Sequence, residues 1–549
     1  MIKFPFWLKA LLLTIPAILL MVFLVLIAIG WYVKSQMNDS GGELRPLMAA
    51  YDVRYYALEL TVEPETRSIR GVNRVTVETV AAVDRFEIHL DDRLEVASIA
   101  VDGEPAEFGH DDGLVLTELP TPWRPGDRHV VSIRYHGQPK VALRPPWIDG
   151  FVWAETQSGD PWIGVTGEAD GGDNWWPCKD HPSDEPDEGM EIALTVPEGL
   201  VGLTNGRLMG ETVNPDGTVT SSWRVGSPIN NYCVTVNIGP YEPVEILYEG
   251  IGGDLSETLV FWTIPEAADE AGEMWRQMPG ILTVLGKRFG EYPFFADKFW
   301  VAHAPYLGME HQTLVAYGSE FEDNFFGFDE LLLHEVAHEW WGNKITASDW
   351  ADFWLHEGFA SYAEALFVLD TAGEDRYLDY MQYLRSRMTN RVPMVKGTDL
   401  TATEAYSPDI YGKGAWVLHM LRFLLGEEVM AEILWRFADG DHPDACRFVT
   451  TREFIDLVEE IGGRELDWYW QRFLYTAELP SWKVTRTQQD GADLIELEWN
   501  DPSFEMPLPV RIGDRKERVP MPGGRAEFTV DAGAAVVVDP DREVLTVER

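Results

Sequence analysis

The sequence has few cysteines and few basic residues for its length. Three cysteines, Cys178, Cys233 and Cys446, stand among 549 residues. Such scattered thiols exclude a disulfide framework and a thiolate zinc site, and they leave room for one bridge at most. Lysine and arginine number 44 against 91 aspartates and glutamates, which gives a formal net charge of -47. This balance excludes a general nucleic-acid binder, because neutralising phosphate groups requires positive charge.

The acidic excess has two interpretations. It favours cationic substrates, or it is a solvated acidic surface such as proteins of salty habitats carry. Hydrophobic residues make up 45% and charged residues 25% of the chain, which is the composition of a folded protein and not of a disordered one. A chain of 549 residues exceeds what one hydrophobic core can hold, so several domains are expected.

Long apolar runs are absent except near the N-terminus. No charged residue lies between Lys9 and Lys34, and residues 11–33 are enough to cross about 30 Å of hydrocarbon. The run ends with Trp31 and Tyr32, as at an interfacial aromatic belt, whereas a cleaved signal peptide ends at small residues. The sequence therefore predicts an uncleaved, single-pass signal anchor in a lipid bilayer. Everything after it is expected outside the cytoplasm, in the periplasm if the cell is Gram-negative.

Hydrophobic periodicity changes twice along the rest of the chain. From Tyr51 to about Glu245 apolar and polar residues alternate, as in "YYALELTVEP", which is typical of half-buried antiparallel strands. Helical spacing follows, as in "DELLLHEVAHEWWG" and in "REFIDLVEEIGG", which Thr450 and Glu453 open with a capping-box spacing. From Trp482 onward strands and turns return, enough for a small β-sandwich.

These patterns predict a multidomain α+β protein. The expected segments are a cytoplasmic stretch at 1–10, the transmembrane anchor at 11–33, a linker at 34–48, an antiparallel β domain at 49–246, a mainly helical catalytic domain at 247–479 and a C-terminal β-sandwich at 480–549.

The stretch "HEVAHEWWG" at 334–342 is the first candidate for chemistry. His334 and His338 are four residues apart, so on a helix both imidazoles point to the same side. A catalytic zinc ion takes such ligands together with a third protein ligand and an open position for water, and Glu335 is placed to act as general base on that water. The alternative is a pair of hydrogen-bonded histidines on an ordinary buried helix.

A second predicted helix, "WLHEGFASYAEALFV", supplies the missing carboxylate. Glu357 follows His338 after eighteen intervening residues, which allows a helix–turn–helix to fold back and form a His2Glu zinc site. Glu364 lies two turns further on about the same face. It either orients a ligand from behind or is a surface glutamate, and the sequence leaves both open.

Four motifs together resemble the zinc aminopeptidases typified by aminopeptidase N, a gluzincin family that also includes leukotriene hydrolase. They are "HEVAHEWWGN", "WLHEGFASYAE", "LGMEHQ" at 307–312 and "IYGKGAWVLHML" at 410–421. The resemblance covers residues 51–549 and implies a thermolysin-like catalytic domain with one zinc ion per chain. It implies hydrolysis of N-terminal residues from peptides that have a free N-terminus.

The resemblance also assigns roles to individual residues. It implies zinc ligands at His334, His338 and Glu357, a general base at Glu335, an oxyanion donor at Tyr411, and substrate-binding positions at Glu310, Glu168 and Gly308. Glu310 and Glu168 would bind the α-amine of the substrate. Without the resemblance, Tyr411 would be interpreted as an aromatic residue packed before a helix.

This sequence departs from the family pattern in two places. The usual G-x-M-E-N motif carries Leu307 and His311 at its two ends, which puts the side-chain preference in doubt. The Gly-rich segment around Glu168 also contains Asp170 and Asp173, so Glu168 is the weaker of the two amine-site assignments.

Two other functions remain open at this level. One is a catalytically silent member that binds peptides or a partner protein, and the other is a different hydrolase, such as an epoxide hydrolase. The complete set of ligands, base and tyrosine argues against a silent protein. The two glutamates of the amine site favour a peptidase.

Overall fold

The computed structural model describes residues 21–23, 39–253, 255–440 and 446–547. The chain divides into two units, Met1–Asp39 and Ser40–Arg549. The predicted membrane span at 11–33 lies outside the described residues except for the helical residues 21–23. Among the residues described, no helix has both the length and the apolar character needed to cross a membrane.

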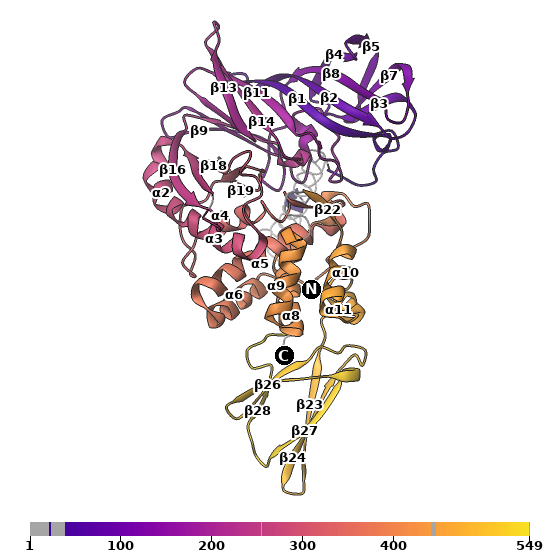
Figure 1. The fold of residues 1–549 in the computed structure, drawn as a ribbon, viewed down its shortest axis with the longest axis vertical. Coiled ribbons are helices and arrows are strands. Elements are labelled where there is room, and N and C mark those ends of the chain that lie inside the picture. Colours follow the sequence, from indigo (N-terminus) through magenta and orange to yellow (C-terminus); the bar gives the residue numbers. More distant parts are fainter. Residues whose placement is uncertain (1–20, 24–38, 254, 441–445, 548–549) are drawn as a thin grey trace, which may run out of the picture. The chain divides into compact units, whose positions relative to one another are not determined.

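The unit Ser40–Arg549 begins with an eight-stranded sheet (Figure 1). Its strands are, in spatial order, β13 (Arg207–Val213), β14 (Thr218–Val225), β11 (Met190–Pro197), β1 (Tyr51–Glu63), β2 (Ser68–Thr79), β8 (Arg128–Gly137), β4 (Leu94–Val101) and β5 (Glu104–Ala106). The predicted alternation is confirmed in β1, where Tyr56, Leu58 and Leu60 are buried and the residues between them are more exposed.

The prediction of purely antiparallel strands is wrong at one place in this sheet. β1 and β11 run parallel, with Tyr56 opposite Met190. A short hairpin forces its strands to be antiparallel. More than a hundred residues separate these two strands, so β11 enters the sheet without that constraint.

Two smaller sheets complete the N-terminal β region. One contains β3 (Val83–His89), β7 (Leu114–Trp123) and β6 (Phe108–Asp111), and the other β12 (Val201–Thr204), β15 (Val236–Gly239), β10 (Pro161–Thr166) and β9 (Gly150–Glu155). The loop after β10 carries Glu168.

A five-stranded sheet leads into the helical region. Its order is β16 (Glu242–Glu249), β17 (Ser256–Thr263), β18 (Trp300–His303), β20 (Leu314–Tyr317) and β19 (Gly308–Met309). β16 pairs with β17 along its whole length. The domain boundary predicted after residue 246 therefore falls inside a strand, and β16 belongs with the elements that follow it.

Two of the helices lie between β17 and β18 in the sequence, and the rest lie between β20 and the C-terminal strands. In chain order the helices are α2 (Ala268–Met274), α3 (Met278–Phe289), α4 (Glu330–Ala337), α5 (Trp354–Ala372), α6 (Glu374–Ser386), α7 (Ala402–Ala405), α8 (Asp409–Leu425), α9 (Glu427–Trp435), α10 (Thr451–Gly462) and α11 (Asp467–Phe473). The short strands β21 (Ile345–Ala347) and β22 (Arg447–Val449) pair with each other in parallel. The capping box predicted at Thr450 and Glu453 is confirmed at the start of α10.

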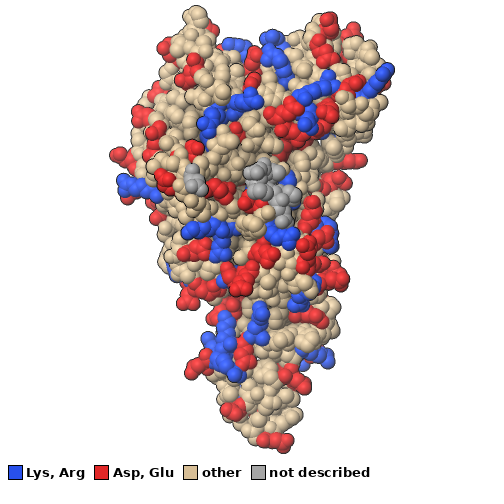
Figure 2. Space-filling model, viewed as in Figure 1, with Lys and Arg blue, Asp and Glu red and all other residues tan. Residues whose placement is uncertain are grey.

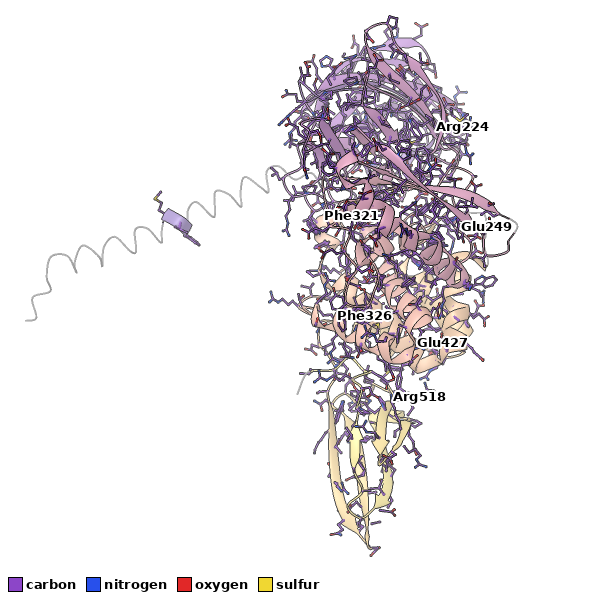
Figure 3. All side chains as sticks on the ribbon, turned by 90° about the vertical axis from the view of Figure 1, so that its left-hand side faces the viewer. Arg224, Glu249, Phe321, Phe326, Glu427 and Arg518 are labelled. Carbon is purple, nitrogen blue, oxygen red and sulfur yellow. The ribbon has the colours of Figure 1, made fainter. Side chains whose placement is uncertain are left out.

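The C-terminal region consists of two three-stranded antiparallel sheets. One contains β23 (Trp482–Gln489), β24 (Ala492–Trp499) and β27 (Arg525–Asp531), and the other β26 (Arg515–Val519), β25 (Leu508–Ile512) and β28 (Val536–Val538). Arg518 of β26, labelled in Figure 3, donates to the carbonyl oxygen of Phe423 in α8. This contact joins the C-terminal strands to the helix that carries Tyr411.

Side chains of both charges lie on the face of the molecule that Figure 2 shows, among uncharged ones. Figure 2 shows acidic side chains spread over one face and interspersed with basic ones. The three cysteines are free thiols, so the single bridge that the sequence allowed is not formed.

Candidate active site

Helix α4 places the two histidines of the "HEVAH" stretch. Asp329 begins the helix as its N-cap, because its carboxylate accepts the backbone N–H of Leu332 at 3.0 Å. His334 lies in the last turn of the helix and His338 is its C-cap. The Nε2 atoms of the two imidazoles are 3.2 Å apart.

Helix α5 brings Glu357 to the same point. Its Oε2 atom lies 3.2 Å from Nε2 of His334 and 3.5 Å from Nε2 of His338. All three candidate ligand atoms lie within 4.8 Å of one another. The structure thus brings together the three residues for which the sequence predicted a metal site.

The hydrogen bonds at Nδ1 of the two imidazoles leave their Nε2 atoms available to bind a cation. Nδ1 of His338 donates to the carbonyl oxygen of Trp341 at 2.8 Å, and Nδ1 of His334 lies 2.6 Å from Oε1 of Glu364. In a neutral imidazole whose Nδ1 carries the proton, Nε2 offers a lone pair. Two such lone pairs and a carboxylate oxygen therefore converge, and a metal ion such as zinc is the group that three acceptors share.

Glu364 orients His334 from behind and is not a surface glutamate. Its side chain is buried, at 3% exposure, and the hydroxyl of Tyr380 donates to its second oxygen. Such a carboxylate fixes the ring orientation and raises the basicity of a metal-binding imidazole. The structure therefore decides between the two interpretations that the sequence left open.

Glu335 faces the cavity beside the ligands. Burial raises the pKa of this carboxyl to about 8, although the neighbouring His334 opposes the shift. A Cβ atom on Gly308 would lie 2.8 Å from Oε1 of Glu335. Glycine at 308 is therefore what allows strand β19 to approach the glutamate so closely.

Tyr411 reaches the cavity because two helices cross at glycines. A Cβ atom on Gly358 of α5 would lie 2.8 Å from Cα of Gly414 in α8, so the two backbones are in direct contact. This crossing places the Tyr411 ring 5.9 Å from the His334 ring, measured between centroids. Burial raises the pKa of the Tyr411 phenol well above its usual value, so the hydroxyl stays protonated and can donate.

Glu310 and Glu168 face the same cavity from two different regions of the chain. Each has a buried Oε1 atom with no hydrogen-bond partner among the described residues. Burial raises the pKa of both carboxyls, and the charge of Glu310 adds to the shift at Glu168. Two carboxyl groups that each keep one oxygen without a donor are suited to receive a cation such as an ammonium group.

Glu168 is the acid of its segment that lines the cavity. Asp170 instead forms a buried ion pair with Lys140 at 2.8 Å, and Asp173 is buried outside the cavity lining. Asp149 accepts the backbone N–H groups of Ala169 and Asp170 at 2.7 and 3.0 Å. This clamp behind Glu168 has no sequence signal, because strands β9 and β10 separate its two halves.

The cavity has a volume of about 480 Å³. Besides the residues predicted from the sequence, its lining includes Trp147, Leu307, Ser319, Glu330, Arg387 and Tyr406. Leu307 is partly exposed at the wall, whereas His311 is fully buried and does not line the cavity. Of the two departures from the family motif, the first is therefore placed to contact a substrate.

The sequence is similar to a known peptidase domain and to known aminopeptidases. The peptidase family M1 domain matches residues 304–473. Leucyl aminopeptidase of Saccharolobus solfataricus is 24% identical over 68% of this chain and 48% of its own length. Aminopeptidase N of Haemonchus contortus is 25% identical over 67% of this chain and 42% of its own length. The chain thus spans about half the length of the curated relatives it matches.

A solved structure shares the fold. The M1 zinc metallopeptidase of Deinococcus radiodurans, a mutant bound to a Tyr-Ser-Ala substrate, superimposes with a TM-score of 0.66 at 24% identity. The match covers 81% of this chain and 98% of that one. Residues 304–473 thus match the peptidase family M1 domain, and the chain shares its fold with an M1 zinc metallopeptidase.

Proposed function

We propose that this protein is a zinc-dependent aminopeptidase that removes N-terminal residues from peptides. The observation that carries the proposal is one cavity lined both by the three convergent candidate ligands and by Glu310 and Glu168, each of which has a buried Oε1 atom without a hydrogen-bond partner among the described residues. The first group supports metal-assisted hydrolysis and the second supports recognition of a free amine.

His334, His338 and Glu357 would hold one zinc ion. Bound there, zinc would polarise the scissile carbonyl and make a water molecule more acidic. The burial of His338 and Glu357 and the hydrogen bonds at Nδ1 of both histidines keep the ligand atoms in place before the ion arrives. Such prior arrangement reduces the entropy that binding would otherwise cost.

Glu335 and Tyr411 would carry the proton and charge movements. Glu335 accepts a proton from the attacking water as its oxygen bonds to the carbonyl carbon, and then delivers that proton to the leaving nitrogen. Tyr411 donates its hydroxyl to the carbonyl oxygen as negative charge develops there. The bond between carbon and nitrogen breaks, and a free amino acid and a peptide shorter by one residue result.

Glu310 and Glu168 would determine where the chain is cut. A hydrolytic centre alone attacks any peptide bond that reaches it. A pair of carboxylates beside that centre binds the α-ammonium of the first residue, and a charge-assisted contact of this kind contributes about 1.5–3 kcal/mol. The bond presented for hydrolysis is then the first one of the peptide.

The N-terminal segment supports a further part of the proposal. The uncharged run at 11–33, between Lys9 and Lys34, would anchor the protein in a membrane with the catalytic part outside the cytoplasm. Protease accessibility of the catalytic part in intact cells or spheroplasts tests this orientation. A mature protein that begins near residue 35 and is soluble would contradict the anchor.

The activity is tested with a panel of aminoacyl fluorogenic amides. We expect turnover that a chelator abolishes and that added zinc restores. The same peptide offered with a free and with an N-acetylated terminus tests the amine subsite, because acetylation removes only the positive charge. Equal cleavage of both forms would exclude an aminopeptidase and would favour an endopeptidase.

A further inference from the structure

The three residues Ser40–Gly42, which open the unit Ser40–Arg549, hydrogen-bond both to the loop that carries Glu168 and to residues 400–402, which precede Tyr411 in the sequence. The sequence alone placed them in a linker. We infer that Ser40–Gly42, here named the strap, is a positioning element that holds the Glu168 loop against the catalytic helices and so sets the amine subsite. This inference rests on the proposed aminopeptidase function.

One side of the strap holds the N-terminal β region. The backbone N–H of Ser40 donates to the carbonyl oxygen of Ala169 at 3.0 Å. Ala169 is the residue directly after Glu168. Nε2 of His181 lies 3.1 Å from the carbonyl oxygen of Gly42, which adds a second contact to the same region.

The other side of the strap holds the catalytic region. The backbone N–H of Ala402 donates to the carbonyl oxygen of Ser40 at 2.9 Å, and that of Gly42 donates to the carbonyl oxygen of Leu400 at 3.1 Å. Ala402 begins α7, and α7 leads to the cavity residue Tyr406 and on to Tyr411. The strap therefore links the carboxylate of the amine subsite to the segment that precedes the catalytic tyrosine.

The strap is enclosed so tightly that only glycine fits in its middle. Gly41 has a φ of +84°, and a Cβ atom there would lie 2.4 Å from Cδ1 of Trp350. Ser40 is buried, and its Oγ accepts the indole N–H of Trp350 at 3.3 Å. Trp350 belongs to the short helix η6 (Trp350–Asp352), which comes just before α5 and its ligand Glu357.

The two carboxyl groups of the proposed amine subsite would move apart without a contact that holds their segments together. Glu168 and Glu310 line the same cavity, and each has an Oε1 atom without a hydrogen-bond donor among the described residues, so the two side chains repel each other when both are ionised. The Asp149 clamp fixes the Glu168 loop to its own β region, but it does not set the distance from that loop to the catalytic helices. The strap bonds to both sides and opposes the separation of the two carboxylates.

A consequence concerns the release of the catalytic part from its tether. Cleavage before Ser40 leaves the strap in place and preserves amine recognition. Cleavage after Gly42 removes it, and the remaining protein keeps every metal ligand but binds free amines more weakly.

The test uses the full-length protein and two zinc-directed inhibitors that differ in one group. L-leucine hydroxamate carries an α-amine, whereas 4-methylpentanehydroxamic acid is the same molecule without it. The ratio of their inhibition constants reports the amine subsite, and bound zinc measured by mass spectrometry reports the metal site. The variants are Gly41→Val and the milder Gly41→Ala, and the matched control is Glu43→Ala, whose side chain is exposed.

We expect Gly41→Val to weaken the amine-bearing inhibitor by about tenfold, the size of one lost charge-assisted contact. The inhibitor without an amine should stay within about twofold and the zinc content at the parent level, since the metal ligands are untouched. Glu43→Ala should match the parent in both. If Gly41→Val does not fold, Gly41→Ala gives the decisive ratio, with the same direction of change.

Two outcomes are distinguishable from the expected one. Equal weakening of both inhibitors, or no change in their ratio, would overturn the role of the strap. If the parent itself bound both inhibitors equally well, the amine subsite and with it the proposed function would fail, whatever the strap variants did.

Discussion

The proposed metal ligands and the proposed amine subsite face one cavity, but the chain builds them in different ways. His334 and Glu357 are 23 positions apart and lie on α4 and α5, which are consecutive helices. Glu310 follows the edge strand β19, and Glu168 lies in a loop of the N-terminal β region. The first set is fixed by helix geometry and one connection, whereas the second depends on packing between distant segments.

The two sets also differ in how their side chains are supported. The histidines of the metal set have partners at both ring nitrogens, including Glu364 and the carbonyl oxygen of Trp341. The carboxylates of the amine set are held mainly through their backbones, as where Asn343 donates to the carbonyl oxygen of Glu310 at 2.9 Å. Substitutions around the metal set should therefore abolish activity, whereas those around the amine set should adjust it.

The largest effect is expected from Glu335→Gln, which removes the proton acceptor and leaves the ligands in place. General acid–base groups typically contribute about 10²–10⁴ in rate, so kcat should fall by that factor. Bound zinc, measured by atomic absorption, should stay at the parent level. The matched control Glu357→Ala should lose metal and turnover together. Parent-like turnover in the glutamine variant would show that no base is needed at this position.

Tyr411→Phe should have the next largest effect. The hydroxyl is proposed to act on charge that develops only in the transition state, so kcat should fall by about 10²–10³ while KM changes little. Steady-state kinetics on one aminoacyl amide give both constants. A variant within a factor of two of the parent would mean that the ring only packs against His334.

The same comparison explains what the sequence could reveal. The spacing of His334 and His338 follows from helix periodicity, and Glu357 lies on the next predicted helix at a distance that lets the chain fold back, so these three candidate ligands were predictable from the residues alone. The role of Glu364 was not, because exposure depends on the helices that cover it, and the structure shows α6 supplying Tyr380 to it. The order of the strands was hidden as well, since the parallel pair β1 and β11 joins segments with no local signal.

The contacts that assemble the amine subsite were the least predictable. Asp149, Lys140 and the strap Ser40–Gly42 meet the Glu168 loop through contacts between segments far apart in the sequence. Hydrophobic periodicity describes single helices and strands, and it carries no information on which loops meet. The resemblance to a family supplied Glu168 and Glu310, but not the contacts that hold Glu168 in place.

Glu310→Gln should weaken the binding of the substrate amine and leave the metal site unchanged. Losing a charge-assisted contact of about 1.5–3 kcal/mol should lower kcat/KM on free-amine peptides by one to two orders of magnitude. Zinc content should not change, because the ligand atoms keep their positions. The residual cleavage of an N-acetylated peptide serves as the control and should be the same in parent and variant. A variant that lost metal as well would show that the two sets are not independent.

The smallest effect is expected from Asp149→Asn, which alters the clamp behind Glu168 and touches neither substrate nor metal. The amide oxygen of asparagine can still accept the N–H groups of Ala169 and Asp170, so the loop keeps its hydrogen bonds but loses their charge. Because burial raises the pKa of Asp149 to about 7, the carboxyl is only about half ionised near neutral pH, and the substitution removes only that partial charge.

Since the hydrogen bonds are weakened and not lost, the effect should lie at the lower end of the about 0.5–1.5 kcal/mol that one hydrogen bond contributes, which corresponds to a rise in KM of about threefold, with kcat within a factor of two. The matched comparison is Lys140→Met, which leaves Asp170 buried without its ion-pair partner and should lower the melting temperature. A purely structural clamp would lower stability in both variants and leave the KM of Asp149→Asn unchanged. If the clamp positions Glu168, Asp149→Asn should raise KM without lowering the melting temperature. The rise should be seen only with substrates that have a free amine.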